Sequence, residues 1–265
     1  MPTLDLHHVD SFTDRPFAGN PAGVCFLESP REAEWMQAVA RELRHSATAF
    51  LLAQEVGFRL RWFSPAVELE LCGHGTLASA HVLWETGRLE AGETARFHTR
   101  SGELTAERRG EWIELDFPAG RVEAVEPPPG LLAAMGVEAG FVGKSGFNYL
   151  LELTAEDAVR AAAPDLQALR SLGVTGVIVT APGTGNPFDF VSRYFAPGLG
   201  IDEDSVTGSA HCVLAPYWAA RLGKEEMLAY QASARGGVVR VRAVGERVKL
   251  GGQAVTVLQG RLLAG

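Results

Sequence analysis

The chain has 265 residues, 46% of them hydrophobic, which is enough apolar material for one large core or two modest ones. Its formal net charge of −8, from 24 Lys and Arg against 32 Asp and Glu, argues against nucleic acid or an anionic membrane as the main partner. No apolar run approaches the length of a membrane span, and the first residues lack a basic region followed by an apolar one, so we expect a cytoplasmic protein.

The first half of the chain alternates short strand patterns with two helix patterns. We expect strands at 4–9, 24–27, 48–52, 58–63, 95–99, 103–108 and 112–117. Ser29-Pro30 resembles an N-cap followed by proline at the first helical position, and predicts a helix to about His45. The second helix begins in the stretch 71–84, whose first residues are small and polar and whose later residues are apolar on nearly every side. Such a helix must be buried all round.

The turn that opens this second helix contains Gly73 and Gly75. Glycines let a ligand approach the backbone, and the free amides and macrodipole of a helix start favour negative charge. The turn therefore predicts an anion site inside the protein. A similar turn returns at 204–209, again followed by an apolar helix.

The second half repeats the order of the first. Pro127-Pro128-Pro129, within the segment 123–130, is the best linker candidate, because consecutive prolines neither join a sheet interior nor continue a helix. We therefore expect two halves, residues 1–122 and 123–265. After the linker we expect a helix at 155–171 and three strands, at 149–153, 176–180 and 189–194.

Specific residues support an internal duplication. Ser79-Ala80-His81 recurs 130 positions later as Ser209-Ala210-His211. Six residues recur without a gap at an offset of 135: Arg100, Gly102, Gly110, Glu111, Ile113 and Leu115 match Arg235, Gly237, Gly245, Glu246, Val248 and Leu250. Coincidence among common Gly and Ala positions is the alternative, and the shared Glu and Arg weaken it.

Two such units predict an α+β fold. Each half would curl its strands into a barrel-like sheet around its apolar helix, because a helix without a polar stripe must be covered on all sides. We expect the two helix starts to converge on a cleft between the halves, where ligand sites are common.

The sequence does not support several common kinds of functional site. The sequence has no phosphate-loop motif, and Gly73-His74-Gly75 alone is a weak hint of a dinucleotide site. We expect no metal site, because His7 and His8 point to opposite faces of a strand while His81 and His211 fall inside buried helices.

The three cysteines are too few and too scattered for a disulfide framework. Buried free thiols are the simplest interpretation of Cys25, Cys72 and Cys212. Only Cys72, at the first turn, is a candidate for a reactive group.

After these exclusions, the function that the sequence still supports is acid–base catalysis at an anion-binding cleft. A carboxylate and an imidazole beside backbone donors can move a proton to and from carbon while the amides hold the developing charge. His74 and Asp204 are the candidates, although His74 could equally be a turn histidine that only hydrogen-bonds the backbone, and Asp204 an N-capping residue. For Thr76, Thr207 and Ser209 capping is the stronger expectation, though a capping hydroxyl can also contact a bound carboxylate.

Several longer motifs, in the same order along the whole chain, resemble the PhzF family of phenazine-biosynthesis-like isomerases. They are Asp10-Ser11-Phe12-Thr13, Phe17-Ala18-Gly19-Asn20-Pro21-Ala22-Gly23-Val24, Arg61-Trp62-Phe63-Ser64-Pro65, Leu71-Cys72-Gly73-His74-Gly75-Thr76-Leu77-Ala78, Glu203-Asp204-Ser205-Val206-Thr207-Gly208-Ser209-Ala210 and Arg235-Gly236-Gly237.

The resemblance implies a diaminopimelate-epimerase-like fold of two pseudo-symmetric halves, usually in a homodimer. It also implies cofactor-free proton transfer on a small anionic metabolite, typified by isomerisation of dihydro-hydroxyanthranilate. It makes His74 and Asp204 catalytic, and it implies that the substrate is bound by Asn20, Ser46, Cys72, Gly73, Gly75, Thr76, Thr207, Gly208 and Ser209.

Two departures from the family pattern bear on activity. The family segment Ser-Glu-Thr-Ala-Phe carries the glutamate that shuttles the proton, and here it is Ser46-Ala47-Thr48-Ala49-Phe50. Ser205 stands where proline is usual. Related cysteine-dependent epimerases carry thiols at about the positions of Cys72 and Ser205, so a two-thiol racemase is not expected here.

Two functions therefore compete. The first is a PhzF-like isomerase or epimerase acting on a small carboxylate-bearing substrate. The alternative is a catalytically impaired member that binds a small anion or a partner protein, because the methyl group of Ala47 carries no proton. An alanine introduced to trap a bound substrate would give the same sequence.

Overall fold

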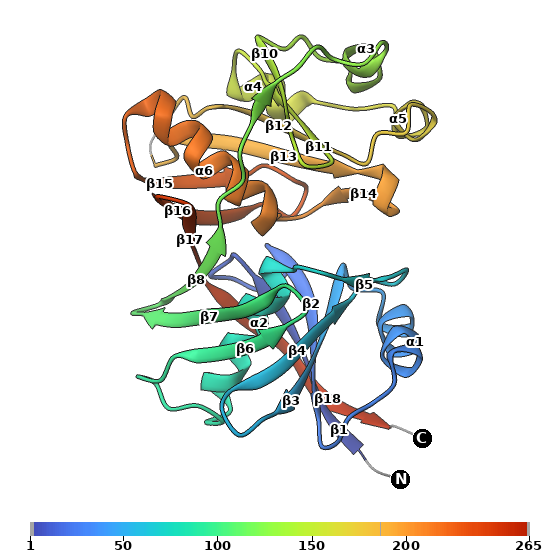
Figure 1. Cartoon of the computed structure of the whole chain (residues 1–265), viewed down its shortest axis with the longest axis vertical. Coiled ribbons are helices and arrows are strands. Elements are labelled where there is room, and N and C mark those ends of the chain that lie inside the picture. Colours follow the sequence, from blue (N-terminus) through green and yellow to red (C-terminus); the bar gives the residue numbers. More distant parts are fainter. Residues whose placement is uncertain (1–2, 186, 264–265) are drawn as a thin grey trace. The chain divides into compact units, whose positions relative to one another are not determined.

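The computed structural model describes residues 3–185 and 187–263, which fall into two compact units. One unit runs to Phe117 and resumes at Gly251, and the other is Pro118–Leu250. This division differs from the expected halves 1–122 and 123–265 because the last strand, β18 (Ala254–Leu263), pairs antiparallel with β1 (Thr3–Ser11) (Figure 1). The C-terminal strand therefore belongs to the first unit.

The first unit is built from nine strands and two helices in the part of the chain described. Besides β1 and β18 its strands are β2 (Asn20–Leu27), β3 (Ala47–Ala53), β4 (Phe58–Phe63), β5 (Glu68–Leu69), β6 (Ala95–Thr99), β7 (Gly102–Arg109) and β8 (Trp112–Pro118). Its helices are α1 (Ala33–Leu43) and α2 (Gly73–Glu85).

Helix α2 is the core of the first unit. Almost every residue of α2 is buried, and the helix contacts β1, β2, β3, β7 and β18. The sequence predicts this arrangement, because α2 carries no charged residue before Glu85 and so has no face for water. The prediction of a buried apolar helix is confirmed. Helix α1 packs instead on the outer side of the sheet, where Met36, Val39 and Ala40 join Phe50 and Phe63 in a second cluster.

The second unit contains the remaining elements. Its strands are β9 (Glu123–Ala124), β10 (Phe141–Ser145), β11 (Asn148–Glu152), β12 (Gly176–Pro182), β13 (Phe190–Ala196), β14 (Ile201–Asp204), β15 (Glu226–Gln231), β16 (Gly237–Val244) and β17 (Arg247–Gly252), which ends beside the division. Its helices are α3 (Leu131–Met135), α4 (Glu156–Ala161), α5 (Leu166–Ser171), the 3₁₀ turn η1 (Pro197–Leu199) and α6 (Gly208–Leu222).

Strand pairing is the same in the two units. In the first, β1–β2 and β3–β4 are antiparallel, β2–β3 and β4–β6 are parallel, and β6–β7 is antiparallel. In the second, β10–β11 and β12–β13 are antiparallel, β11–β12 and β13–β15 are parallel, and β15–β16 is antiparallel. Each apolar helix, α2 or α6, lies at the same place in this order. The topology thus repeats as the sequence duplication predicts.

Three expected elements differ from the structure. The helix expected at 155–171 is two short helices, because Pro164 lacks the amide that a continuous helix needs. Helix α1 begins at Ala33 after Glu32, so Ser29-Pro30 precedes the helix rather than capping it. The segment 123–130 does not join the units, since β9 at its start pairs with β10 inside the second unit.

No helix within the described residues is long and apolar enough to cross a membrane.

Candidate functional site

The start of α2 is the candidate site of the first unit, and we call it a half-site because the sequence predicts a matching one at the start of α6. Cys72 occupies the N-cap position in an extended conformation, and its side chain makes no capping hydrogen bond. The amides of the first helical turn, beginning at Gly73, have no partner within the helix. Ser11 at the end of β1 donates a hydrogen bond to the carbonyl oxygen of His74 at 2.9 Å, which ties the helix start to the sheet.

Close packing explains one glycine of this turn. A Cβ atom on Gly75 would lie 2.8 Å from Cδ1 of Trp62 and 3.0 Å from Sγ of Cys72. Any side chain at position 75 would therefore push Trp62 or Cys72 out of place. The glycine keeps the helix start against the indole as well as exposing backbone amides.

His74 lies between a thiol and a hydroxyl. Its Nδ1 is 3.5 Å from Sγ of Cys72, and its Nε2 is 3.1 Å from Oγ of Ser46. The Ser46 hydroxyl is itself 2.7 Å from Oδ1 of Asn20 at the start of β2. Segments around residues 20, 46 and 72–74 thus meet at one imidazole, which is 7% exposed.

The hydrogen-bond network assigns the tautomer of neutral His74. The single proton of Ser46 is directed to the carboxamide oxygen of Asn20, so Oγ of Ser46 accepts from Nε2–H of His74. Nδ1 is then the unprotonated nitrogen. Sγ of Cys72 is 3.5 Å from Nδ1 and 3.8 Å from Nε2, so the thiol lies against the face of the ring and not along the in-plane lone pair of Nδ1. An imidazole whose other nitrogen is held by a hydrogen bond can accept and return a proton at its unprotonated nitrogen.

Ala47 begins β3 directly after Ser46 and is fully buried. Ala49, two residues later, is paired with Trp62 of β4, and directly paired residues share one face of a sheet. Ala47 therefore lies on the same face as Trp62, which covers the start of α2. Thr76 is directed elsewhere: its hydroxyl donates to the carbonyl oxygen of Cys72 at 2.6 Å.

The second half-site lies at the start of α6. Asp204 ends β14 and is 8% exposed, and its Oδ2 accepts a hydrogen bond from the hydroxyl of Thr207 at 2.6 Å. Gln231, at the end of β15, accepts from the Thr207 amide at 2.8 Å and donates to the Asp204 carbonyl oxygen at 2.7 Å. This fully buried glutamine holds the turn in a single conformation.

The N-cap position of α6 belongs to Thr207 and not to Asp204. Asp204 lies three residues before this position, and Thr207 directs its hydroxyl to the Asp204 carboxylate rather than to the helix. Burial and the nearby Asp204 raise the pKa of Tyr194, whose hydroxyl donates to Asn148 at 2.8 Å. Gly208 is the first helical residue, and Ser209 after it is exposed.

Two buried residues of these half-sites escaped the sequence analysis. Trp62 belongs to a quoted motif, but nothing in the motif indicates that its indole N–H is buried without a hydrogen-bond partner among the described residues. Gln231 carries no local signal, because its partners lie 24 and 27 positions earlier in the chain. A buried donor and an organising amide are thus visible only in three dimensions.

Of the other histidines, His211 adjoins the second half-site, because its Nδ1 donates to the carbonyl oxygen of Thr207 at 2.8 Å. His211 is fully buried inside α6, and burial lowers its pKa to about 4. His81 is partly exposed, 3.7 Å from Glu85, and burial also lowers its pKa. Burial raises the pKa of both Cys25 and Cys212 to about 12, so these thiols are inert. Within the described ranges no group of three or more His, Cys, Asp or Glu side chains could hold a metal ion.

Comparisons with known proteins agree over nearly the whole chain. Residues 9–260 match the family model described as phenazine biosynthesis-like protein. An uncharacterized isomerase from Halalkalibacterium halodurans is 47% identical over 264 residues, covering 99% of this chain and 100% of that protein. A crystal structure of a phenazine biosynthesis protein of the PhzF family from Enterococcus faecalis is 38% identical, with a TM-score of 0.93 over 99% of this chain and 100% of that one.

A more distant structure shares the fold. A hydroxyproline epimerase from Agrobacterium vitis is 12% identical, with a TM-score of 0.65 over 99% of this chain and 91% of that one. These likenesses confirm the expected α+β, diaminopimelate-epimerase-like fold.

Proposed function

Because the chain belongs to the phenazine biosynthesis-like (PhzF) family, we propose that it is an isomerase or epimerase that moves a proton on a small carboxylate-bearing substrate without a cofactor. His74 and Asp204 are the proposed proton carriers. The observation that carries this proposal is the buried imidazole of His74, whose Nε2 lies 3.1 Å from the Ser46 hydroxyl and whose ring lies against the Cys72 thiol.

Proton transfer at carbon needs a base, an acid and a way to hold the developing negative charge. In this proposal the bare Nδ1 of neutral His74 takes up a proton, and the Asp204 carboxylate exchanges one at the other half-site. The first amides of α2 and α6, at Gly73, Gly75 and Gly208, hold the substrate anion, because helix starts favour negative charge. Asn20, Ser46, Cys72, Thr76, Thr207 and Ser209 are the proposed substrate-binding side chains.

Deuterium exchange in D₂O tests for proton transfer at carbon, and it does not require the product of the reaction to be known. Candidate carboxylates, with dihydro-hydroxyanthranilate among them, are incubated with the protein, and deuterium incorporation at carbon is followed by NMR. His74→Gln and Asp204→Asn are each expected to slow exchange by about 10²–10⁴-fold, the usual contribution of general acid–base catalysis. Asp202→Asn is the matched control, since Asp202 is exposed and pairs with Arg170. Unchanged exchange in both variants would overturn these roles.

One observation favours a second function. Ala47 is buried on the sheet face that covers the start of α2, where a glutamate would supply a further carboxyl group. A chain without that group could bind a small anion or a partner protein and turn nothing over.

Restoring the carboxylate discriminates the two functions. Ala47→Glu provides a group that exchanges protons, whereas Ala47→Gln has nearly the same shape and provides none. Faster exchange in the Glu variant alone indicates a catalyst weakened by Ala47. No exchange in either variant, with a carboxylate still bound in calorimetry, indicates a binding protein.

The family likeness also motivates proposals about the assembly and its location. We expect a homodimer in the cytoplasm, with a small anionic metabolite as its ligand. Sedimentation equilibrium of the purified chain checks the oligomeric state.

A further inference from the structure

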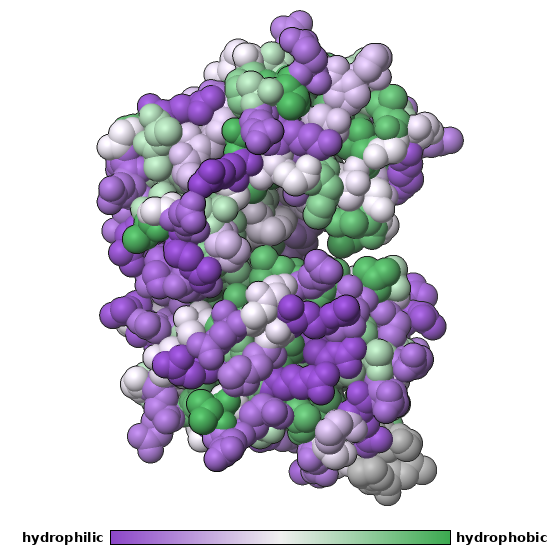
Figure 2. Space-filling model, in the orientation of Figure 1, coloured by the Kyte–Doolittle hydropathy of each residue, from purple (hydrophilic) through white to green (hydrophobic). Residues whose placement is uncertain are grey.

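A row of basic side chains lies on the outer face of the first unit, over β4 and β6. Along β4, Leu60 and Trp62 are buried while Arg59 and Arg61 face outward. In the adjacent parallel strand β6, Phe97 is buried and His98 is paired with Arg59. Strand alternation therefore collects these cations on one face, together with Arg100 just after β6. This part of the surface is hydrophilic in Figure 2.

The carboxylates nearby only partly balance these charges. Glu68 binds Arg61 through two hydrogen bonds, of 2.7 and 2.8 Å, and also accepts from Arg100 at 2.9 Å. The hydrogen bond from Arg61 holds the pKa of Glu68 below its usual value. The charges of Glu32, just before α1, and of Glu34 in α1 act on Arg61 as well, and Glu103 pairs with Arg96. Arg61 and Arg100 thus share Glu68 as their directly bonded carboxylate.

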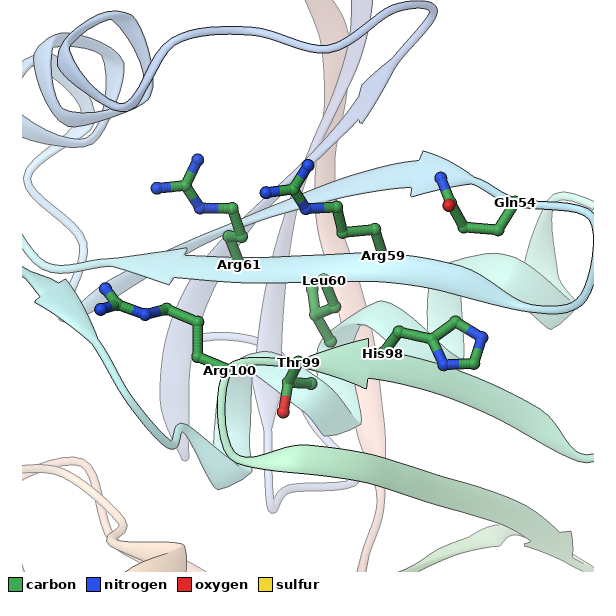
Figure 3. A pocket seen from close by; sticks show the side chains of 7 residues that line it. All are labelled: Gln54, Arg59, Leu60, Arg61, His98, Thr99 and Arg100. Carbon is green, nitrogen blue, oxygen red and sulfur yellow. The ribbon is translucent and has the colours of Figure 1, made fainter.

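Arg59 is the cation left over. No hydrogen bond or ion pair joins its guanidinium to any residue in the described part of the chain. In Figure 3 the side chains of Arg59, Arg61 and Arg100 extend in the same direction. Arg59 and Arg61 lie two residues apart on one strand and on the same face, so an anion bound there would reduce their mutual repulsion.

The arginines line a hollow of about 420 Å³ (Figure 3). Its walls include Gln54, Arg59, Arg61, His98, Thr99 and Arg100. A second hollow, lined by Arg31, Arg59 and Arg61 together with apolar side chains near α1, is only about 20 Å³. That is room for a single water molecule, so a ligand would be held in the larger hollow.

His98 is not available as a direct ligand through its protonated nitrogen. Its Nε2 lies 2.7 Å from the carbonyl oxygen of Val56, to which it donates, and its Nδ1 is 4.0 Å from Glu103. The donors left for an anion are the guanidinium of Arg59 and the edge of the Arg100 guanidinium that does not bond Glu68. Guanidinium forks match the oxygen pairs of phosphate groups better than a point charge does.

We propose that this pocket, lined by Arg59 and Arg100, binds the phosphate group of a small molecule. The net charge of −8 disfavours the binding of long polyanions such as nucleic acids. The hollow has the size of a small-molecule site, so we expect a compact dianion as its ligand. The pocket is separate from the residues proposed for proton transfer. Its occupancy is therefore measured without any enzymatic assay.

NMR titration at constant ionic strength tests the proposal on the full chain. Inorganic phosphate and phenyl phosphate are added against sodium chloride of equal ionic strength, and the arginine Nε–H signals are followed. We expect saturable shifts for Arg59 and Arg100. Arg59→Gln should weaken binding at least about 10-fold, the loss that follows removal of a charged hydrogen-bond donor. Arg109→Gln, an exposed arginine of β7 paired with Glu107, is the control.

Comparing the affinities of the two phosphate compounds identifies the kind of ligand. Tighter binding of phenyl phosphate indicates a phosphorylated metabolite, and equal binding indicates free phosphate, so either result supports the site. Arg59→Lys keeps the charge without the fork and should bind with intermediate affinity. The proposal is overturned if neither anion gives a saturable shift, if Arg59→Gln and Arg109→Gln behave alike, or if acetate binds as tightly as phosphate.

Discussion

The hydroxyl of Ser46 lies 3.1 Å from Nε2 of His74, although the two residues are 28 positions apart. Since the Ser46 proton is directed to Asn20, the hydroxyl oxygen accepts from the imidazole and fixes which nitrogen carries its proton. The basic nitrogen of His74 is consequently Nδ1.

Ser46→Ala should release this tautomer. Without its acceptor, the Nε2–H group of His74 is left buried, and the ring can turn or shift its proton to Nδ1. In ¹⁵N NMR of the imidazole, we expect the wild type to show Nε2 protonated and the variant a mixture. Ser46→Thr keeps the hydroxyl and should retain the wild-type pattern. An unchanged tautomer in Ser46→Ala would show that other contacts hold the ring.

Gly75→Ala should destabilise the first unit. The added methyl group would meet Trp62 at 2.8 Å and Cys72 at 3.0 Å inside a packed core, and overpacking of this kind costs about 1–3 kcal/mol. Urea denaturation measures the loss. Gly92→Ala serves as the comparison, because nothing lies within 4 Å of its added methyl group. Equal stability of the two variants would contradict the packing argument.

Gln231→Leu should loosen the turn before α6. The substitution leaves the Thr207 amide and the Asp204 carbonyl oxygen without their partner, and each buried unsatisfied group costs about 1–3 kcal/mol. We expect the free energy of unfolding to fall by about 2–5 kcal/mol. Gln167→Leu, at an exposed position of α5, should change it by less than about 0.5 kcal/mol. A loss below about 1 kcal/mol for Gln231→Leu would mean that the turn holds without the amide.

Stability should fall in mild acid, in part through His211. Burial lowers the pKa of this histidine from 6.5 to about 4, so between these values the unfolded chain binds a proton that the folded chain does not. The stabilisation is complete above about pH 6.5 and is lost as the pH falls toward 4. Between pH 7 and pH 4.5 this amounts to about 2–3 kcal/mol.

His211→Leu isolates this contribution. Urea denaturation at pH 7 and pH 4.5 should show a smaller acid-induced loss in the variant than in the wild type. A residual loss is expected, because burial also lowers the pKa of His7 and His81. The same pH dependence in both proteins would rule out His211 as a source.

Local patterns in the sequence were sufficient for some features of the fold and of the half-sites. Helix α2 has no charged residue before Glu85, so the sequence alone predicted that the helix is buried. The glycine turn also placed Cys72, His74 and Thr76 within one helical turn. Strand alternation likewise separated Arg59 and Arg61 from Leu60 and Trp62. Each of these follows from the period of a helix or a strand, which a short stretch of sequence contains in full.

Tertiary structure decided everything that depends on which segments are neighbours. The pairing of β18 with β1 moved the C-terminal strand into the first unit, and the strand register set Ala47 on the face of Trp62. Ser46 reached His74, and Gln231 reached Thr207, across more than twenty intervening residues. Side-chain hydrogen bonds require partners a few ångströms apart in space, and no local periodicity encodes that distance. The sequence by itself therefore determined the buried helix and its glycine turn, whereas only the folded chain determined which nitrogen of His74 is basic.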